Sequence, residues 1–433
     1  MIVFRLNSGH ALTLSIEDSI CRYHRMKGHT VRWIPGLDHA GIATQMMVEK
    51  MLWTKHKKTR HDLTREQFLS EVNEWKAKRS EEIRQQFLRL GICLDYEKQF
   101  YTLSEEMSEA VTEAFIRLFN SGQIYRRSQA VNWSYYLRST ISDIEVEFQQ
   151  IKGPTLLTVP GFDGKVLVGV MHRFNYPIEG QDSKIIPVAT TRLETILGDV
   201  AVAVHPEDKR YSQLIGRNAV NPLNGRLMPI LADESVLPEF GTGAVKITPG
   251  HSNFDYAIAE KHSLPVIDIF DESGRLRSPE LPEFHGLHRF EAKVVMQTEL
   301  RSRGLYLDQS EHNHSLPICS RSGDLIETRR LPQWFLRCDK QRVLAQFVVN
   351  RDLMSGTDEQ IWNQLKDSLS EEDQHLSVVP PNYRNVWRDW FNRYEDWCIS
   401  RQIYWGHRIP AFNVIKDNQM TDEWVAAKRY AFL

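Results

Sequence analysis

The hydrophobic pattern of this chain changes character twice along its length. From about residue 150 to about residue 315, short β-rich runs such as Lys165–Val170 and Val200–Val204 alternate with Gly, Pro and Asp. On both sides the pattern is helical, and a strand pattern over Thr30–Ile34 follows a helix pattern over residues 11–27. The sequence therefore predicts an α/β fold that contains a compact β-rich insertion.

Size and composition exclude several classes of protein. A chain of 433 residues with 41% hydrophobic and 25% charged residues is typical of a globular protein and not of a disordered, collagen-like or coiled-coil one. No apolar run approaches the ~20 residues that span a bilayer, so no membrane partner is expected. A net charge of −2 excludes a basic protein that coats nucleic acid. Five scattered cysteines without a C-x-x-C pair argue against a disulfide framework or a structural zinc site.

Two capping boxes define helices in the first third of the chain. Thr64 with Gln67 predicts a helix that ends near Gly91. Thr102 with Glu105 predicts the next helix in the same way.

Two polar segments stand where ligands are commonly bound. Gly9 and His10 open the first predicted helix, where free backbone N–H groups and an imidazole can hold a phosphate, although such a pair can also be a simple helix cap. Asp38 and His39 follow a predicted strand, at the edge where open α/β sheets place their ligands. Asp38 can hold an ammonium group or cap the helix predicted to begin near Ala40.

These segments belong to a series of motifs in a fixed order. Besides PGLDHAGIATQ at 35–45, the series comprises VNWS at 131–134, ISDIEV at 141–146, TTRLET at 190–195, GTGAVK at 241–246, PQWF at 332–335, DWCISRQ at 396–402 and WGHRIP at 405–410. The series resembles the valyl-tRNA synthetases, a family of class I aminoacyl-tRNA synthetases, over nearly the whole chain.

The resemblance implies an incomplete Rossmann-type catalytic core that is split by an editing domain. Residues 1–150 would form its first part with connective helices, 151–315 the editing domain, and 316–433 the return to the catalytic domain. The implied reaction joins valine to a valine-specific tRNA with ATP, and Mg²⁺ accompanies the ATP. We expect no protein-bound metal and a monomeric protein.

The resemblance also assigns residues to the synthetic site. Asp38 would bind the valine ammonium with His39 beside it, and Trp397 would form part of the wall against the isopropyl group. Gly9 and His10 would contact the ATP phosphates, with His10 in a catalytic role. A buried tryptophan is more often part of a core, so the assignment of Trp397 depends on the motif alone.

A second pocket is implied in the middle segment. The side chains of Thr190, Thr191 and Arg192 match the threonine-rich editing motif, and Asp255 matches the carboxylate that holds the ammonium of the misacylated amino acid. The run Gly241, Thr242 and Gly243 would let the backbone approach the terminal adenosine. Without the resemblance, threonine and aspartate in such loops would be interpreted as turn residues.

Some positions depart from the family pattern. Leu193 replaces a proline, and Gly250 and Ser252 stand where the family has alanine and aspartate. Asn7 replaces the first histidine of the ATP motif, and the chain ends at Leu433, before the family's second ATP-binding loop and anticodon-binding domain. We therefore expect a fragment, a splice form or an incomplete gene model.

Two alternatives to a complete ligase stay open at this point. The chain could retain only the deacylase activity of the editing domain, or it could be inactive. Residues 317–326 (PICSRSGDLI) look like the animal mitochondrial form, so the mitochondrial matrix is expected, with the cytoplasm as the alternative.

Overall fold

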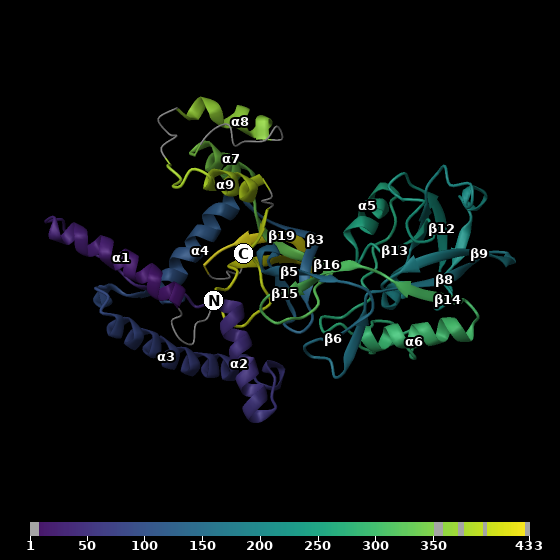
Figure 1. The fold of residues 1–433 in the computed structure, drawn as a ribbon, viewed down its shortest axis with the longest axis horizontal. Helices are drawn as coiled ribbons and strands as arrows, with labels where there is room; N and C mark the ends of the chain where they lie inside the picture. The colour runs from purple at the N-terminus through teal and green to yellow at the C-terminus, as the bar shows by residue number, and fades with distance from the viewer. Residues whose placement is uncertain (1–7, 350–357, 371–375, 393–395, 429–433) are drawn as a thin grey trace. The chain divides into compact units, whose positions relative to one another are not determined.

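The chain divides into two compact units. The computed structural model describes residues 8–349, 358–370, 376–392 and 396–428, without the side chains of residues 182 and 183. Unit 1 comprises Met1–Arg127 and Gln333–Leu433, and unit 2 comprises Ser128–Pro332. The sequence predicts a middle domain over residues 151–315, whereas unit 2 begins before residue 151 and ends after residue 315. The chain passes between the units inside two strands, β3 (Ile124–Ser134) and β16 (Glu327–Leu336) (Figure 1).

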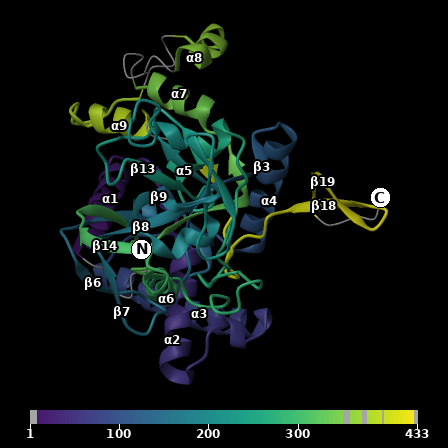
Figure 2. The same cartoon turned by 90° about the vertical axis from the view of Figure 1, so that its right-hand side faces the viewer.

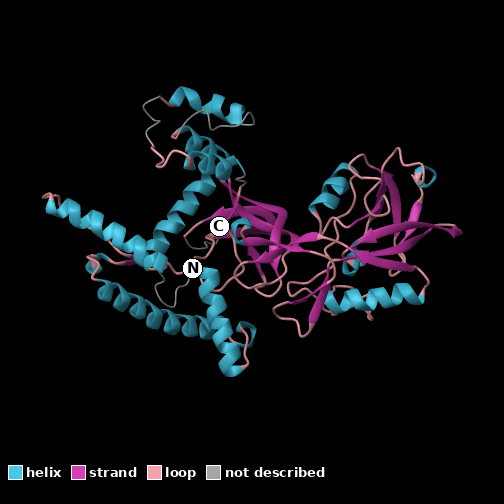
Figure 3. Cartoon of the chain, viewed as in Figure 1, coloured by secondary structure: helices cyan, strands magenta, loops and turns pink. Residues whose placement is uncertain are grey.

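Unit 1 is mainly helical (Figure 3). Its helices are α1 (Ser8–Met26), α2 (Gly41–His56), α3 (Arg65–Leu90), α4 (Glu105–Asn120), α7 (Asp339–Phe347), α8 (Glu359–Leu365) and α9 (Tyr383–Asn392). Its strands are the short β1 (Gly36–Leu37), β2 (Phe100–Tyr101) and β17 (Trp397–Cys398), and the hairpin of β18 (Ala411–Lys416) and β19 (Gln419–Ala426) (Figure 2). None of the helices that the structure describes is both long enough and apolar enough to cross a membrane.

Of the two predicted capping boxes, the structure contains one. Thr64 and Gln67 form the predicted capping box of α3, and Gly91 ends this helix in the left-handed conformation with φ 71°. The prediction for Thr102 is wrong, because Ser104 caps α4 by accepting a hydrogen bond from the Met107 N–H.

The strand predicted at residues 30–34 is also wrong. The strand of this region is β1, which lies two residues further on and pairs in parallel with β2, with Gly36 opposite Phe100. A Cβ atom on Gly36 would overlap the Phe100 ring, so the two strands meet through a glycine. This parallel pair is only two residues long on each strand.

Two of the hydrophobic clusters in the described part of unit 1 contain residues of the motifs. The first joins α2, α3 and the Trp405 loop through buried Val48, Phe68 and Val72. The second joins α4 to β16 and β19, and in it the rings of Phe115 and Trp334 lie 5.8 Å apart. Trp334 therefore packs as a core residue.

Unit 2 is built on a seven-stranded sheet. The strand order is β13-β10-β12-β11-β8-β14, with β9 also paired to β8, and only the β10–β12 pair is parallel. The strands are β8 (Val170–Ile178), β9 (Gln181–Thr190), β10 (Ala201–Val204), β11 (Asn218–Val220), β12 (Leu227–Ala232), β13 (Ala244–Ile247) and β14 (Tyr306–Glu311). The predicted runs Val200–Val204 and Lys165–Val170 correspond to β10 and to β7 (Lys165–Val168) with the start of β8.

Smaller elements surround this sheet. The helices are α5 (Asn253–Lys261) and α6 (Arg289–Ser302), and the short ladders pair β6 (Thr155–Thr158) with β7, β5 (Val146–Ile151) with β15 (His314–Cys319), and β4 (Ser139–Ile141) with β3. The turn after β9 is the 3-10 helix η4 (Leu193–Gly198), whose residues are all buried.

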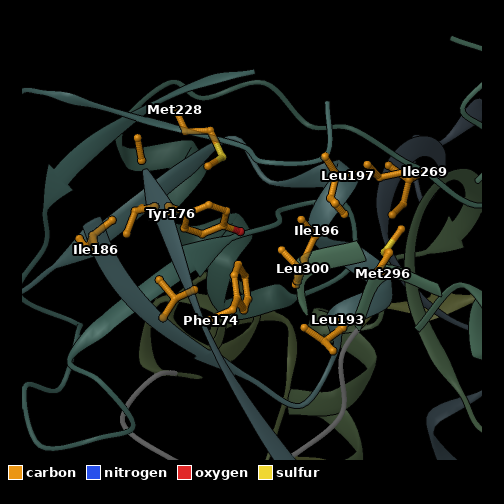
Figure 4. Packing of buried hydrophobic residues seen from close by; sticks show 14 of the residues in the cluster. Phe174, Tyr176, Ile186, Leu193, Ile196, Leu197, Met228, Ile269, Met296 and Leu300 are labelled. Atoms are coloured by element: carbon orange, nitrogen blue, oxygen red, sulfur yellow. The ribbon is translucent and has the colours of Figure 1, made fainter. Parts of the chain in front are cut away.

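Leu193 belongs to the main hydrophobic core of unit 2 (Figure 4). Its side chain is completely buried in the same cluster as Phe174, Ile196 and Leu300. Leu193 therefore fills the core beneath the threonine-rich turn.

The burial of Leu193 leads to a stability prediction. Leu193→Ala is expected to lower the free energy of unfolding by about 2–5 kcal/mol, because the lost methyl groups leave a cavity. The matched control Leu237→Ala, at a side chain that is 66% exposed, is expected to change it by less than about 0.5 kcal/mol. Hydrogen–deuterium exchange of the β8 and β9 amides would measure both, and equal protection in the two variants would contradict the core assignment.

Candidate functional site

The first cluster of polar residues lies where β1 and β2 end. Because these strands are parallel, Asp38 and His39 after β1 come beside Thr102 after β2. The Thr102 hydroxyl accepts a hydrogen bond from the His39 N–H (2.9 Å) and lies 2.7 Å from His39 Nδ1. The His39 carbonyl accepts hydrogen bonds from the Thr44 hydroxyl and the Trp405 indole N–H. These contacts fix the backbone and the ring of His39.

A second histidine faces His39. The rings of His39 and His407 meet edge to face with centroids 5.4 Å apart. Burial lowers the pKa of His39, and the neighbouring His407 lowers it further, while Asp38 acts in the opposite direction. Burial also lowers the pKa of His407. Near pH 7 both imidazoles are therefore neutral, and His39 Nδ1 lies 3.5 Å from the Asp38 carboxylate. His407 lies in the WGHRIP motif, but sequence reasoning gave it no role.

Asp38 is exposed and only partly engaged. Its Oδ1 accepts a hydrogen bond from the Ala40 N–H (2.8 Å), and its side chain is 78% exposed. Ala40, in the left-handed conformation, is the N-cap position of α2. Asp38 therefore forms a turn ahead of the helix and does not occupy its N-cap, and its carboxylate stays open to a cationic ligand.

The other predicted residues of unit 1 lie on different elements. Gly9 and His10 occupy the first turn of α1. Asn7 lies outside the described residues. Trp397 lies on β17 opposite Leu336 and is 50% exposed, so it is not a core tryptophan. Within the described ranges, Trp397 shares no hydrogen bond or ring contact with Asp38 or His39.

In unit 2, the predicted segments converge on the end of β9. Thr190 is the last residue of β9, and its hydroxyl accepts a hydrogen bond from the Arg192 N–H (3.0 Å). The Thr191 carbonyl accepts a hydrogen bond from Lys293 Nζ (3.2 Å). A Cβ atom on Gly241 would lie 3.1 Å from that of Ala189, so the glycine loop runs beside the same strand end.

The glycine loop itself is a tight turn. Gly241 and Gly243 have φ values of 59° and 78°, which only glycine adopts readily. Between them, the Thr242 hydroxyl accepts from the Ala244 N–H (3.4 Å), and its carbonyl accepts from the Tyr211 hydroxyl (2.7 Å).

Arg192 connects this turn to the loop that contains His251. Its guanidinium donates to Glu194 (3.1 Å), to Glu327 (2.6 Å) and to the His251 carbonyl (3.2 Å). Burial raises the pKa of Glu327, but Arg192, His251 and Arg289 together bring it well below its usual range. The charge of Arg192 is thus already balanced by carboxylates, which favours a positioning role for this residue.

Asp255 is held at the start of α5. One of its carboxylate oxygens accepts from the Thr248 N–H (2.7 Å), and the other from the Ser252 hydroxyl (2.9 Å). Ser252 is also the N-cap of α5, and it accepts from the Asp255 N–H. Ser252 therefore caps this helix and orients the Asp255 carboxylate. A Cβ atom on Gly250 would overlap the Ile267 carbonyl, which explains glycine at that position.

Sequence reasoning missed a buried polar network behind this cluster. Lys246 Nζ donates to Asp199 Oδ1 (2.8 Å) and to the hydroxyls of Thr195 (2.7 Å) and Thr248 (2.6 Å). Asp199 also accepts hydrogen bonds from the hydroxyls of Tyr176 and Thr248. All five side chains are buried. The sequence signal for this network is Lys246 itself, a single charged residue within the apolar run of β13.

The network links the site to the core. Burial raises the pKa of Asp199, and Lys246 acts against this. Through Thr248, the Lys246–Asp199 pair is connected to the carboxylate of Asp255. Across the residues that the structure describes, no group of three or more His, Cys, Asp or Glu could hold a metal ion.

His172 is a second residue that sequence reasoning missed. It stands opposite Thr190 in the β8–β9 ladder, and its Nδ1 lies 2.9 Å from the Tyr306 hydroxyl. Burial lowers the pKa of His172 to about 4, so its imidazole is neutral at pH 7.

The Lys246–Asp199 pair gives a second stability prediction. Asp199→Asn is expected to cost about 3–5 kcal/mol of unfolding free energy, because Lys246 is left buried without a counter-charge. Asp308→Asn breaks an ion pair with Arg173 in which both side chains are about half exposed, so it should leave the unfolding free energy nearly unchanged. Urea denaturation of both variants tests this, and a small effect of Asp199→Asn would mean that the network does not support the site.

Comparisons with known proteins agree with these motifs. The family model described as tRNA synthetases class I (I, L, M and V) matches residues 4–431. Among curated relatives, the mitochondrial valine–tRNA ligase of Mus musculus is 44% identical over 98% of this chain and 38% of its own length. The valine–tRNA ligase of Homo sapiens is 45% identical over 94% of this chain and 31% of its own length. The mitochondrial valine–tRNA ligase 1 of Arabidopsis thaliana is 43% identical over 98% of this chain and 37% of its own length.

The chain thus spans less than two fifths of the length of these relatives. The family match, in contrast, runs almost from one end of the chain to the other. With its mixed helices and strands and its ordered motifs, the chain belongs to the class I tRNA synthetases of the I, L, M and V group.

Proposed function

We propose that this chain is the part of a valine–tRNA ligase that carries the amino-acid site and an editing site. In this proposal unit 1 belongs to a Rossmann-type catalytic domain, and unit 2 is the editing insertion. The observation that carries the proposal is the presence of two polar clusters in separate units, one around Asp38 and one around Thr190 and Asp255. Identities of 43–45% with valine–tRNA ligases support the choice of valine.

In the synthetic reaction, the valine carboxylate attacks the α-phosphorus of ATP and pyrophosphate leaves. The exposed carboxylate of Asp38 would bind the valine ammonium, and His39 and His407, both neutral, would offer uncharged polar groups beside it. Gly9 and His10 at the start of α1 would hold phosphate oxygens, where the helix dipole favours an anion. Half-exposed Trp397 would form a wall for the isopropyl group.

In the second step, a hydroxyl of the terminal ribose of tRNA attacks the activated carbonyl, and AMP leaves. A pocket shaped for valine rejects threonine poorly, because the two side chains have nearly the same shape. Enzymes that activate valine are known to prefer it over threonine by a factor of only about 10², so a second, hydrolytic pocket is needed.

In unit 2, water would attack the ester carbonyl of threonyl-tRNA. The bond between the carbonyl carbon and the ribose oxygen breaks, the ribose hydroxyl regains a proton, and threonine leaves. Asp255 would hold the threonine ammonium, and the hydroxyls of Thr190 and Thr191 would contact the side chain and orient the water. The loop of Gly241, Thr242 and Gly243 would approach the terminal adenosine, and Arg192 would keep the turn in place.

The same proposal names partners and compartment. The ligands would be valine, ATP and a valine-specific tRNA, and Mg²⁺ would arrive with the ATP phosphates. Several relatives are named as mitochondrial ligases, which supports the mitochondrial matrix. A monomer is proposed as the working state.

The editing proposal is tested with Asp255→Asn. This change keeps an oxygen that can accept the Thr248 N–H but removes the charge, so kcat/KM for deacylation of threonyl-tRNA should fall about 10- to 100-fold. Glu260→Gln removes one exposed charge from the same helix and should leave the rate unchanged. Deacylation at the wild-type rate by Asp255→Asn would remove Asp255 from the site.

The synthetic proposal is tested with Asp38→Asn. Asparagine keeps the hydrogen bond from the Ala40 N–H but not the charge, so the KM for valine in valine-dependent ATP–pyrophosphate exchange should rise about 10- to 100-fold. Asp339→Asn is the control, because Asp339 is also exposed and accepts from a neighbouring backbone N–H (2.8 Å). An unchanged KM would make Asp38 a turn residue only. Deacylation without any exchange would favour a chain that only edits.

A further inference from the structure

Unit 1 contains a pocket that the proposed chemistry does not use. Its volume is about 420 Å³, and it opens between α3, the turn before α4 and the loop of residues 404–406. Its polar lining residues are Arg65, Asn73, Lys76, Tyr101, Ser104 and Tyr404. No carboxylate is among the lining residues.

One face of α3 supplies the wall with both of its cations. Arg65, Leu69, Asn73 and Lys76 follow one another at helical spacing, so they share that face. Arg65 and Lys76 are eleven residues apart, which separates their Cα atoms by about 16 Å along the axis. The positive charge therefore extends along the pocket.

Both cations are held by aromatic rings instead of carboxylates. Lys76 Nζ lies 4.3 Å from the centre of the Tyr101 ring, and the Arg65 guanidinium lies 5.9 Å from that of Tyr404. In the part of the chain that the structure describes, neither cation forms an ion pair. Arg60, which also faces the Tyr404 ring, is paired with Glu49 at 3.2 Å. The pocket cations thus keep their charge for a ligand.

One hydroxyl group adds a further donor. The Ser104 oxygen accepts from the Met107 N–H, which leaves its own hydrogen to donate. A wall of cations and donors without carboxylates matches an oxyanion, and phosphate oxygens accept such bonds strongly.

We propose that this pocket binds phosphate groups of an RNA strand. The inference rests on the proposed function, because tRNA is the RNA that a synthetase would hold. A strand is favoured over a single phosphate because the Cα atoms of Arg65 and Lys76 are about 16 Å apart along α3, several times the ~3.4 Å axial spacing of phosphates in one strand of a duplex. The strand would lie along α3, with Lys76 and Arg65 on separate phosphates.

The test is the affinity of the whole chain for valine-specific tRNA, measured by fluorescence anisotropy across salt concentrations. Lys76→Gln and Arg65→Gln should each weaken binding about 3- to 10-fold and reduce the slope of log K against log salt by about 0.7–1. Lys78→Gln and Arg89→Gln are the controls, because they remove the same charges from exposed positions of the same helix. Thermal unfolding would establish that all four variants are folded.

Three outcomes would overturn the proposal. Equal losses in all four variants would mean general attraction between charges. Unchanged tRNA affinity in Lys76→Gln and Arg65→Gln would remove RNA from the pocket, even if inorganic phosphate bound there. A wild-type chain that binds no tRNA would also contradict RNA binding in this pocket. Valine-dependent ATP–pyrophosphate exchange, which needs no tRNA, is expected to be unchanged in all four variants, so failure of the ligase proposal would be visible separately.

Discussion

A lysine ammonium inside an apolar sheet must have a counter-charge, and the candidate editing site of unit 2 is arranged around that requirement. Lys246 projects from β13, and Asp199, at the end of η4, neutralises it. Asp199 also accepts hydrogen bonds from the hydroxyls of Tyr176 and Thr248. The Lys246–Asp199 pair therefore connects β8, η4 and β13. The Thr248 backbone then holds Asp255. A buried ion pair of this kind contributes little net stability, since desolvation offsets the attraction, but it fixes the groups around it.

Local signals were predicted from the sequence, whereas distant partners were not. The Thr64 capping box involves residues three apart, and the structure has it as predicted. Thr102 offered the same local pattern, but its hydroxyl bonds to His39, which is 63 residues away. One hydroxyl can serve either purpose, and only the tertiary fold decides between them. The strand predicted at residues 30–34 failed for a related reason, because β1 forms where a partner strand is available.

The candidate sites show the same limit. The family resemblance identified Asp38, Asp255 and the Thr190–Arg192 turn, but not what supports them. Lys246 stood inside an apolar run, and His172 was one residue of a strand. Each became notable only when pairing placed it beside a counter-charge or a threonine. For Arg192 the opposite holds. Its motif predicts a substrate contact, but in the structure its guanidinium forms ion pairs with the carboxylates of Glu194 and Glu327.

The contact between Gly36 and Phe100 restricts which sequences this region can accept. With the ring lying over the glycine, a methyl group at position 36 would have to displace the far end of the Phe100 ring, whose residue is 42% exposed. Thr102 follows β2 directly, so a residue at position 36 that is too large for the ring to clear would disturb the contact of the Thr102 hydroxyl with His39. Variation at position 36 is thus coupled to an aromatic side chain 64 positions later. A larger residue at 36 would need a smaller one at 100, and homologous sequences should change these two positions together or leave both alone.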